Sequence, residues 1–366
     1  MIPVARPYMP NKDDFYKYIS KIYESKWLTN NGQLVQELTQ RLEDYLGIEN
    51  LLLVSNGTLA LQIAYRALGV SDATPGAQPE AITTPFTFIA TASSLKWDGV
   101  QPVFADIDPN TWCLNPANIE AAITPNTRAI VPVHVFGNVC DVEAIGTIAQ
   151  KHNLKVIYDA SHAFGVNYKG ESLLKHGDAA TLSFHATKLF HTGEGGAIIF
   201  KRKEDLERAK KMINFGITGP ESIEELGINA KMNELQAAMG LCVLDEMEEN
   251  LAARAAVWHR YEQALGQTLQ LQAKPEALDY NYAYFPVVFE SEEQAVRVAA
   301  TLKENGVLAR RYFYPSLESV ACLDAEADQP VSKEIASRIL CLPIFNQLSQ
   351  YDQQSIINLI EVELKA

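Results

Sequence analysis

The sequence predicts an α/β fold with a mainly parallel seven-stranded sheet, helices on both faces, and a small C-terminal α+β domain. From residue 51 to residue 200, short apolar runs alternate with helical patterns, as expected of strands joined by helical crossovers. The link between the last two runs is too short for a crossover, so one of these strands is expected to run antiparallel. The expected strands are 51–55, 81–85, 102–106, 129–135, 155–159, 181–184 and 197–200.

Helical patterns account for most of the remaining chain. The expected helices between strands are 59–68, 89–97, 116–123 and 142–151, after two amphipathic helices at 15–25 and 34–46 separated by an Asn-Asn-Gly turn. A helical region at about 234–265 leads to an expected strand, 282–289, and to helices that start at Ser291 and Ser349. We therefore expect a large domain with an N-terminal lead-in, residues 1–240, and a linking helix with a small C-terminal domain, residues 241–366.

The composition is that of a globular protein and excludes several classes. The 366 residues are 47% hydrophobic and 21% charged, and the net charge of −14 with no basic block argues against nucleic-acid binding. The chain has no apolar run of about 20 residues and no signal peptide, and its five cysteines are scattered, so we expect a cytoplasmic protein without membrane contact. The seven histidines lack zinc-site spacing, so no metal is expected.

Two stretches that follow strands are suited to holding a flat, phosphorylated ligand. Ser55-Asn-Gly-Thr58 opens a helix, where the Gly57 amide and the Thr58 hydroxyl can face an anion, although these residue types are also ordinary helix caps. Phe88 follows another strand and could stack on a ring, although core packing claims most phenylalanines.

Asp159 and Lys188 carry the strongest chemical signal. Asp159 ends an apolar run at the carboxyl end of a central strand, where open α/β sheets bind ligands, and a carboxylate there suits a protonated pyridine nitrogen. Lys188 lies between the last two strands and suits an amine that forms a Schiff base with an aldehyde cofactor. His162 could touch the same ring or be a structural histidine. The two segments resemble the aspartate and lysine of fold-type-I enzymes that use pyridoxal 5′-phosphate (PLP).

The order of motifs over nearly the whole chain resembles the DegT/DnrJ-type family of nucleotide-sugar aminotransferases. The motifs are SNGT (55–58), TFIAT (87–91), DASHAFG (159–165), SFHATK (183–188), GEGG (193–196) and GINAKMNELQAA (227–238). The resemblance implies that Lys188 binds the PLP aldehyde and Asp159 pairs with its ring nitrogen. By the same resemblance the other cofactor-binding residues are Gly57, Thr58, Phe88, His162, Ser183 and, from the neighbouring subunit, Asn229. This implies a homodimer with shared active sites.

The resemblance also implies the two substrates, a keto-sugar nucleotide and glutamate as the amino donor. The expected substrate contacts are Thr29, Asn30, His185, Arg310, Arg311, Tyr312 and Tyr314. The segments around 27–32 and 310–315 are most similar to family members that make dTDP-4-amino-4,6-dideoxyglucose for O-antigen or other glycans, which implies a 4-keto-6-deoxy sugar. Glu318 stands near a position where many members carry histidine, which leaves the sugar open. The alternatives are an enzyme that aminates C3 of the sugar and a catalytically silent regulator on the same fold.

Overall fold

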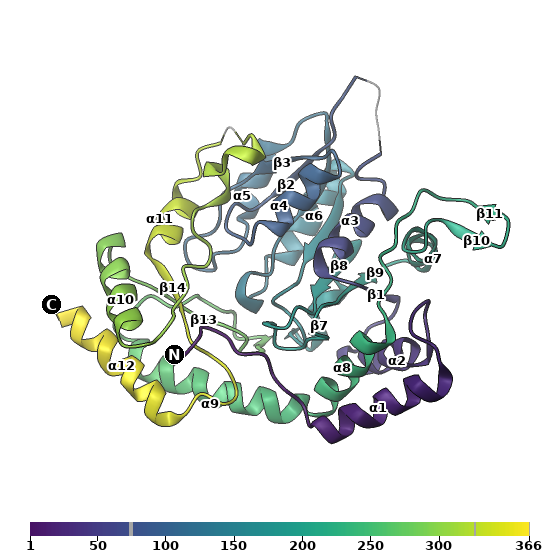
Figure 1. Cartoon of the computed structure of the whole chain (residues 1–366). Coiled ribbons are helices and arrows are strands. Elements are labelled where there is room, and N and C mark those ends of the chain that lie inside the picture. Colours follow the sequence, from purple (N-terminus) through teal and green to yellow (C-terminus); the bar gives the residue numbers. More distant parts are fainter. Residues whose placement is uncertain (73–75, 326, 366) are drawn as a thin grey trace.

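The large sheet has the predicted class and direction. The computed structural model describes residues 1–72, 76–325 and 327–365. Seven strands form one sheet in the order β1-β9-β8-β5-β4-β2-β3, and β9 runs antiparallel to both of its neighbours (Figure 1). The strands are β1 (Leu51–Val54), β2 (Glu80–Thr83), β3 (Gln101–Phe104), β4 (Thr127–Val131), β5 (Lys155–Asp159), β8 (Ala179–Ser183) and β9 (Gly196–Phe200). The predicted sheet is thus confirmed, including the antiparallel member of the last pair.

Both faces of the sheet are covered because its strands are apolar on both sides. Val156 and Tyr158 of β5 pack in one hydrophobic cluster, whereas Ile157 packs in the other. The first cluster includes residues of α2 (Gln33–Leu46), α5 (Pro116–Ile119), α6 (Val142–His152) and α8 (Glu234–Asp245). The second includes residues of α3 (Gly57–Ala67), α4 (Ala90–Trp97) and α7 (Lys203–Met212).

The helical region predicted over residues 234–265 is two helices rather than one. It breaks at Glu246 (φ −107°, ψ 16°), between α8 and α9 (Met247–Leu265). The Glu246 carboxylate accepts hydrogen bonds from the Tyr8 hydroxyl (2.5 Å) and the Asn11 amide (2.9 Å), just before α1 (Lys12–Ser25). The break therefore anchors the N-terminal segment.

The N-terminal segment, residues 2–11, connects distant parts of the molecule. Ile2 forms a parallel bridge with Val307, and the Val4 carbonyl accepts a hydrogen bond from the Ile344 amide (3.1 Å). The Tyr8 carbonyl accepts a hydrogen bond from Nε2 of His191 (2.7 Å), three residues beyond Lys188. The segment thus ties the C-terminal part to the loop that carries the lysine.

The C-terminal part is built around a two-stranded antiparallel pair. The predicted strand over 282–289 is shorter, since β13 is Phe285–Val288 and Tyr282 has a left-handed backbone (φ 53°); it pairs with β14 (Ile339–Leu342). The capped helices are present as α10 (Glu292–Glu304) and α12 (Gln350–Lys365), and α11 is Pro330–Arg338. The division into residues 1–240 and 241–366 stays a prediction.

Five short strands of the described chain lie outside these elements. They are β6 (Asn167–Tyr168), β7 (Glu171–Ser172), β10 (Ile217–Gly219), β11 (Ser222–Ile223) and β12 (Leu278–Asp279). The β10–β11 hairpin projects from the body at the right of Figure 1. Among the described helices, none has the length and apolar character needed to cross a membrane.

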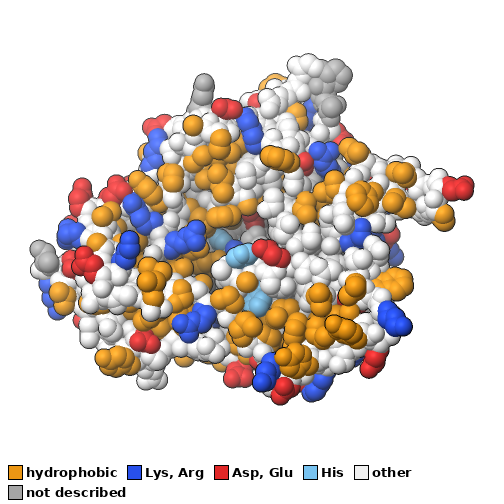
Figure 2. Space-filling view, in the orientation of Figure 1, with side chains coloured by type: hydrophobic (Ala, Val, Ile, Leu, Met, Phe, Trp, Pro, Cys, Tyr) orange, Lys and Arg blue, Asp and Glu red, His pale blue; other side chains and the backbone are white. Residues whose placement is uncertain are grey.

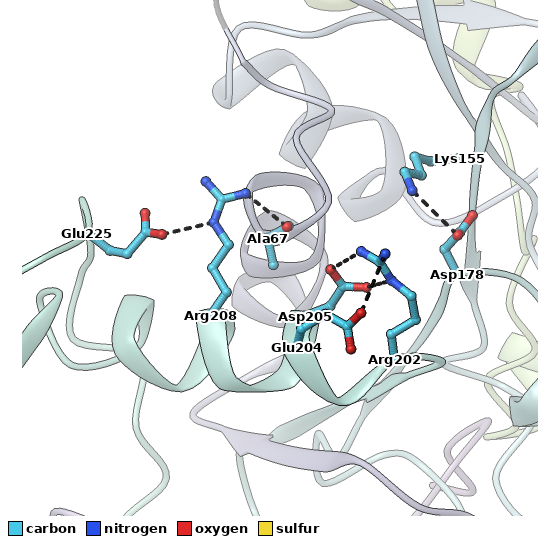
Figure 3. Close-up of polar contacts among 8 residues, drawn as sticks. All are labelled: Ala67, Lys155, Asp178, Arg202, Glu204, Asp205, Arg208 and Glu225. Atoms are coloured by element: carbon cyan, nitrogen blue, oxygen red, sulfur yellow. Dashed lines mark hydrogen bonds and ion pairs between the residues drawn. The ribbon is translucent and has the colours of Figure 1, made fainter.

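Charged side chains cluster where β5 and β8 begin and β9 ends. Figure 3 shows ion pairs that join Lys155 to Asp178 (3.7 Å), Arg202 to Asp205 (2.7 Å) and Arg208 to Glu225 (3.1 Å). Arg208 also donates to the carbonyl of Ala67, at the last turn of α3 (3.1 Å). The contacts of Arg208 thus tie α7 to the end of α3 and to the segment after β11.

Candidate active site

A cavity of about 670 Å³ lies at the opposite edge of the sheet, at the carboxyl ends of β5 and β8. Figure 2 shows histidine side chains near the centre of the face drawn there. The cavity brings together ten of the predicted site residues: Gly57, Thr58, Phe88, Asp159, His162, Ser183, His185, Lys188, Arg310 and Tyr312. The position agrees with the rule that open α/β sheets bind ligands beyond the carboxyl ends of their strands.

Asp159 is a buried carboxylate fixed by hydrogen bonds. It ends β5 and is 5% exposed. Oδ2 accepts a hydrogen bond from Thr91 Oγ1 (2.8 Å), and Oδ1 accepts two from Ser161, through Oγ (2.6 Å) and N (3.1 Å). Sequence reasoning did not assign Thr91 or Ser161, although both lie inside the motifs quoted above. These bonds hold a negative charge at one defined place in the cavity.

His162 is a neutral, tightly packed ring at the cavity wall. Its ring is nearly parallel to those of Phe136 (6.0 Å between ring centres, 8° between planes) and Phe313 (5.8 Å, 2°), which are themselves 5.5 Å apart, so the three rings form one cluster. Burial, together with the charge of Lys188, lowers the pKa of His162 well below its usual value. Nδ1 accepts the Phe136 amide (3.1 Å), so the proton of the neutral ring is assigned to Nε2. The sequence left open whether His162 is a structural residue or contacts a ligand. Its ring is packed among other rings and also lines the cavity, so its position suits both.

Lys188 lies in the loop between β8 and β9, which folds back on itself. The Ala186 amide donates to the Gly193 carbonyl (2.8 Å), and Gly193 adopts a left-handed backbone (φ 79°) suited to glycine. Burial lowers the pKa of Lys188 to about 8, against an opposing effect of the Asp159 charge. A lysine with this pKa is partly neutral near pH 7.5, as a nucleophile or a base requires.

The Lys188 amine also contacts a residue that the sequence did not single out. Nζ donates a hydrogen bond to the hydroxyl of Tyr284 (3.3 Å), which lines the cavity. Sequence reasoning placed Tyr284 inside a strand, and no motif marked it.

The turn before α3 forms an anion site beside the end of β8. The Asn56 side chain caps α3 by accepting the Leu59 amide (2.9 Å), which leaves Gly57 and Thr58 in the first turn, where a helix favours negative charge. Gly57 is needed because a Cβ there would lie 2.8 Å from the Cβ of Ser183. This close approach brings the turn and the Ser183 hydroxyl to the same end of the cavity.

The residues of the cavity fit PLP. A buried carboxylate suits the pyridine nitrogen, a lysine of lowered pKa suits the aldehyde, and a helix N-terminus with hydroxyls suits the phosphate. Phe88, half exposed at the cavity, offers a ring face. This fold and this site together define a PLP-dependent enzyme of fold type I.

Five of the predicted residues lie outside the cavity. Thr29, Asn30 and Asn229 are exposed on the surface of this chain, as is Tyr314. Arg311 is turned away: Nη2 bonds Glu292 (2.6 Å) and the Ser337 carbonyl (2.6 Å), and the guanidinium stacks on the Tyr314 ring.

Glu318 lies away from this cavity in the chain described. It is 7% exposed, accepts a hydrogen bond from Ser316 Oγ (2.5 Å), and lines a separate cavity of about 210 Å³. Its bearing on the choice of sugar stays a prediction.

Comparison with known proteins agrees with the site. The model of the DegT/DnrJ/EryC1/StrS aminotransferase family matches residues 10–361. The chain is 43% identical to a dTDP-4-amino-4,6-dideoxy-D-glucose transaminase of Shigella dysenteriae, over 98% of this chain and 97% of that protein. It is 36% identical to a GDP-perosamine synthase of Caulobacter vibrioides, over 86% and 85%. The solved structure of DesI with its TDP-sugar product has a TM-score of 0.91 at 31% identity, over 99% of this chain and 93% of that one.

The chain therefore belongs to the DegT/DnrJ/EryC1/StrS aminotransferase family. It is a PLP-dependent aminotransferase that acts on sugar nucleotides.

Proposed function

We propose that the protein transfers the amino group of glutamate to C4 of a dTDP-linked 4-keto-6-deoxy sugar, giving dTDP-4-amino-4,6-dideoxyglucose. The observation that carries this proposal is the 43% identity, over nearly the full length of both chains, to the Shigella enzyme of that name. We further propose that the reaction takes place in the cytoplasm and supplies an amino sugar for O-antigen, as part of lipopolysaccharide, or for another glycan.

Lys188 is proposed as the acid and base of the reaction. Bound PLP supplies an electron sink for the bonds that change at the reacting carbons. The partly neutral amine of Lys188 accepts a proton from the α-carbon of the amino donor, and in the second half of the reaction it delivers a proton to C4 of the sugar. Asp159, held by Thr91 and Ser161, keeps the pyridine nitrogen protonated.

The remaining cavity residues are proposed to bind and orient. Gly57, Thr58 and Ser183 hold the cofactor phosphate, and Phe88 and His162 contact its ring. Arg310, with its guanidinium 4.6 Å from the centre of the Tyr312 ring, offers a cation for the phosphates of the nucleotide. His185, at the exposed side of the cavity, would contact the sugar.

We propose a homodimer in which Thr29, Asn30 and Asn229 complete the partner's site. This is supported by their exposure and by the exposed apolar residues near them: Tyr16, Tyr23, Trp27, Leu28, Phe215, Ile217, Ile223, Leu226 and Ile228. Figure 2 shows hydrophobic side chains gathered around α1 and α8 and near the base of the projecting hairpin. An apolar surface of this kind is typical of an interface between subunits.

Exchange of subunits tests the shared site. Homodimers of Lys188→Ala and of Asn229→Ala are expected to be inactive and weakened, respectively. In a mixed dimer with shared sites, one site carries both defects and the other carries none. Activity should then recover toward about half of the wild-type value per dimer. No recovery, with mixed dimers confirmed by mass spectrometry, would show that Asn229 acts within its own chain.

The identity of the sugar is tested by product analysis. Purified enzyme is incubated with glutamate and a panel of 3-keto and 4-keto sugars linked to dTDP, UDP or GDP. We expect turnover to be fastest with the dTDP-linked 4-keto-6-deoxy sugar. Faster turnover of a 3-keto sugar would favour the C3 alternative. Faster turnover of a GDP-linked sugar would favour an activity like that of the Caulobacter relative.

A further inference from the structure

Tyr284 lies next to the reacting atom of the site. Its hydroxyl is 3.3 Å from Lys188 Nζ, and within the part of the chain that the structure describes it is the one side chain hydrogen-bonded to that nitrogen. The rest of its ring lines the cavity, with Nζ 6.0 Å from the ring centre.

The position of Tyr284 is fixed from both ends. Its carbonyl accepts hydrogen bonds from Trp258 Nε1 (3.2 Å) and from the Tyr280 hydroxyl (3.3 Å). Its ring packs against His162 (4.7 Å between ring centres) and Phe136 (5.5 Å). A tyrosine held in this way presents its hydroxyl at one place, and has lost the rotamer freedom that a surface tyrosine keeps.

A buried cation lies behind this tyrosine. Arg254 of α9 is 2% exposed and donates to the carbonyls of Ala283 (3.4 Å) and Ile344 (3.3 Å). Among the described residues no carboxylate forms an ion pair with Arg254, and its positive charge acts on Tyr284. Four residues before it on the same helix, Asn250 donates to the carbonyl of Leu189 (3.2 Å), directly after Lys188. One helix thus supports both members of the Lys188–Tyr284 pair.

A phenolic hydroxyl can form a hydrogen bond with an amine in either of the amine's protonation states. An ammonium group can only donate hydrogen bonds, whereas a neutral amine also accepts them. A phenolic hydroxyl can accept from the first and donate to the second. Burial raises the pKa of Tyr284, against the opposing effect of Arg254 and Arg310, so the hydroxyl keeps its proton in the working pH range.

We propose that Tyr284 is a positioning residue, whose hydroxyl holds the Lys188 amine in place both before and after that amine takes up a proton. The inference rests on the proposed role of Lys188. In the first state the amine accepts from the hydroxyl, and in the second the ammonium donates to it. The reacting proton moves to and from Lys188 and is never transferred to Tyr284, which limits where the amine can point.

Tyr284→Phe removes the hydroxyl and keeps the ring. In the holoenzyme, the single-turnover rate constant with glutamate should fall about 10- to 100-fold, a part of what a positioned acid or base contributes, while KM changes less than about threefold. In the apoprotein, an amine-reactive reagent labels Lys188, and peptide mapping follows the extent of labelling with pH. The midpoint should move below the value of about 8, because the charge-assisted hydrogen bond that the ammonium form loses is stronger than the one that the neutral amine loses.

Tyr261→Phe is the matched control, since it also removes a buried hydroxyl, one without a hydrogen-bond partner in the described chain. It should change neither the rate constant nor the labelling midpoint. An unchanged midpoint in Tyr284→Phe, or a rate constant within twofold of wild type, overturns the proposal, whether or not the variant is less stable. If Lys188→Ala still completes the half-reaction, the failure lies instead in the proposed role of Lys188.

Discussion

The charged groups at the two ends of β5 differ in their partners and in their exposure to water. At its start, Lys155 pairs with Asp178, next to the ion pairs of Arg202 and Arg208 (Figure 3). The Lys155 and Asp178 side chains are 39% and 30% exposed, so water screens the pair. At the end of the same strand, Asp159 is 5% exposed and is held by neutral hydroxyl and amide groups rather than by a cation.

The number of charged residues in a region therefore does not indicate whether that region binds a ligand. The charges at the start of the strand neutralise one another and, apart from the buried Asp205, are at least partly solvated, which leaves them little interaction free energy for a ligand. The charges at its end are desolvated and face a cavity, and desolvation also lowers the pKa of Lys188. Four substitutions or measurements test this comparison.

Loss of Lys188 should have the largest effect. Lys188→Ala should lower turnover by about 10⁴-fold or more, since it removes the amine proposed both to bind the cofactor and to act as acid and base. The fold should be retained, because the side chain lies in a loop at the cavity. Steady-state kinetics and circular dichroism measure the two effects. In the wild type, borohydride reduction should attach the cofactor to Lys188, and an adduct mapped to another lysine would contradict the assignment.

Loss of the Asp159 charge should come second. Asp159→Asn keeps the shape but leaves the protonated ring nitrogen without its counter-charge, so turnover should fall about 10²- to 10³-fold and the Kd for PLP should rise. Fluorescence titration of the apoprotein with PLP measures the affinity. Turnover within tenfold of wild type would show that the charge at this end of β5 is not used.

The pH dependence of Lys188 sharpens the comparison without any substitution. Because burial disfavours the charged amine, its pKa lies near 8 in the folded protein, below the ordinary value of 10.5. Labelling of Lys188 in the apoprotein should therefore increase through about pH 8 and level off above it. Unfolding in urea should return the midpoint to about 10.4. A midpoint above 10 in the folded protein would show that burial does not lower the pKa of Lys188, and the two ends of β5 would then not differ in desolvation as described.

The smallest effect is expected at the start of the strand. Lys155→Ala breaks a partly exposed pair of 3.7 Å, and should lower the free energy of unfolding by about 1 kcal/mol or less, with kcat unchanged. Urea denaturation and steady-state kinetics test this. A loss of activity comparable with that of Asp159→Asn would show that the two ends of β5 do not differ in the way described.

The sequence allowed the sheet to be predicted because its signals are local. Apolar runs and short links mark each strand, and the tight link around Lys188 predicted that one of the last two strands is reversed, which proves to be β9. Cavity residues such as Asp159 and Gly57 followed from their places at the end of a strand or the start of a helix, whereas Ser183 and Arg310 followed from the family resemblance.

What escaped prediction depends on contacts between residues far apart in the chain. Tyr284 meets Lys188 only when the C-terminal part packs on the sheet, over a separation of 96 residues. Arg310 and Arg311 are adjacent and identical in type, yet one lines the cavity and the other is bound by Glu292. The break at Glu246 likewise comes from helix geometry and from bonds to Tyr8 and Asn11, which no local pattern shows.

The N-terminal segment also has a consequence for the time at which the active site is completed. Tyr8 and Glu246 are 238 residues apart, and at about 5–20 residues per second the ribosome needs roughly 10–50 s to add that length. The hydrogen bond to the Val4 carbonyl can form only later still, because its donor, the Ile344 amide, lies near the end of the sequence. The Leu189 carbonyl, next to Lys188, likewise receives its hydrogen bond only after Asn250, 61 residues further along the chain, has been added. The catalytic loop thus receives its last anchor late in synthesis, after the sheet strands that flank it have emerged.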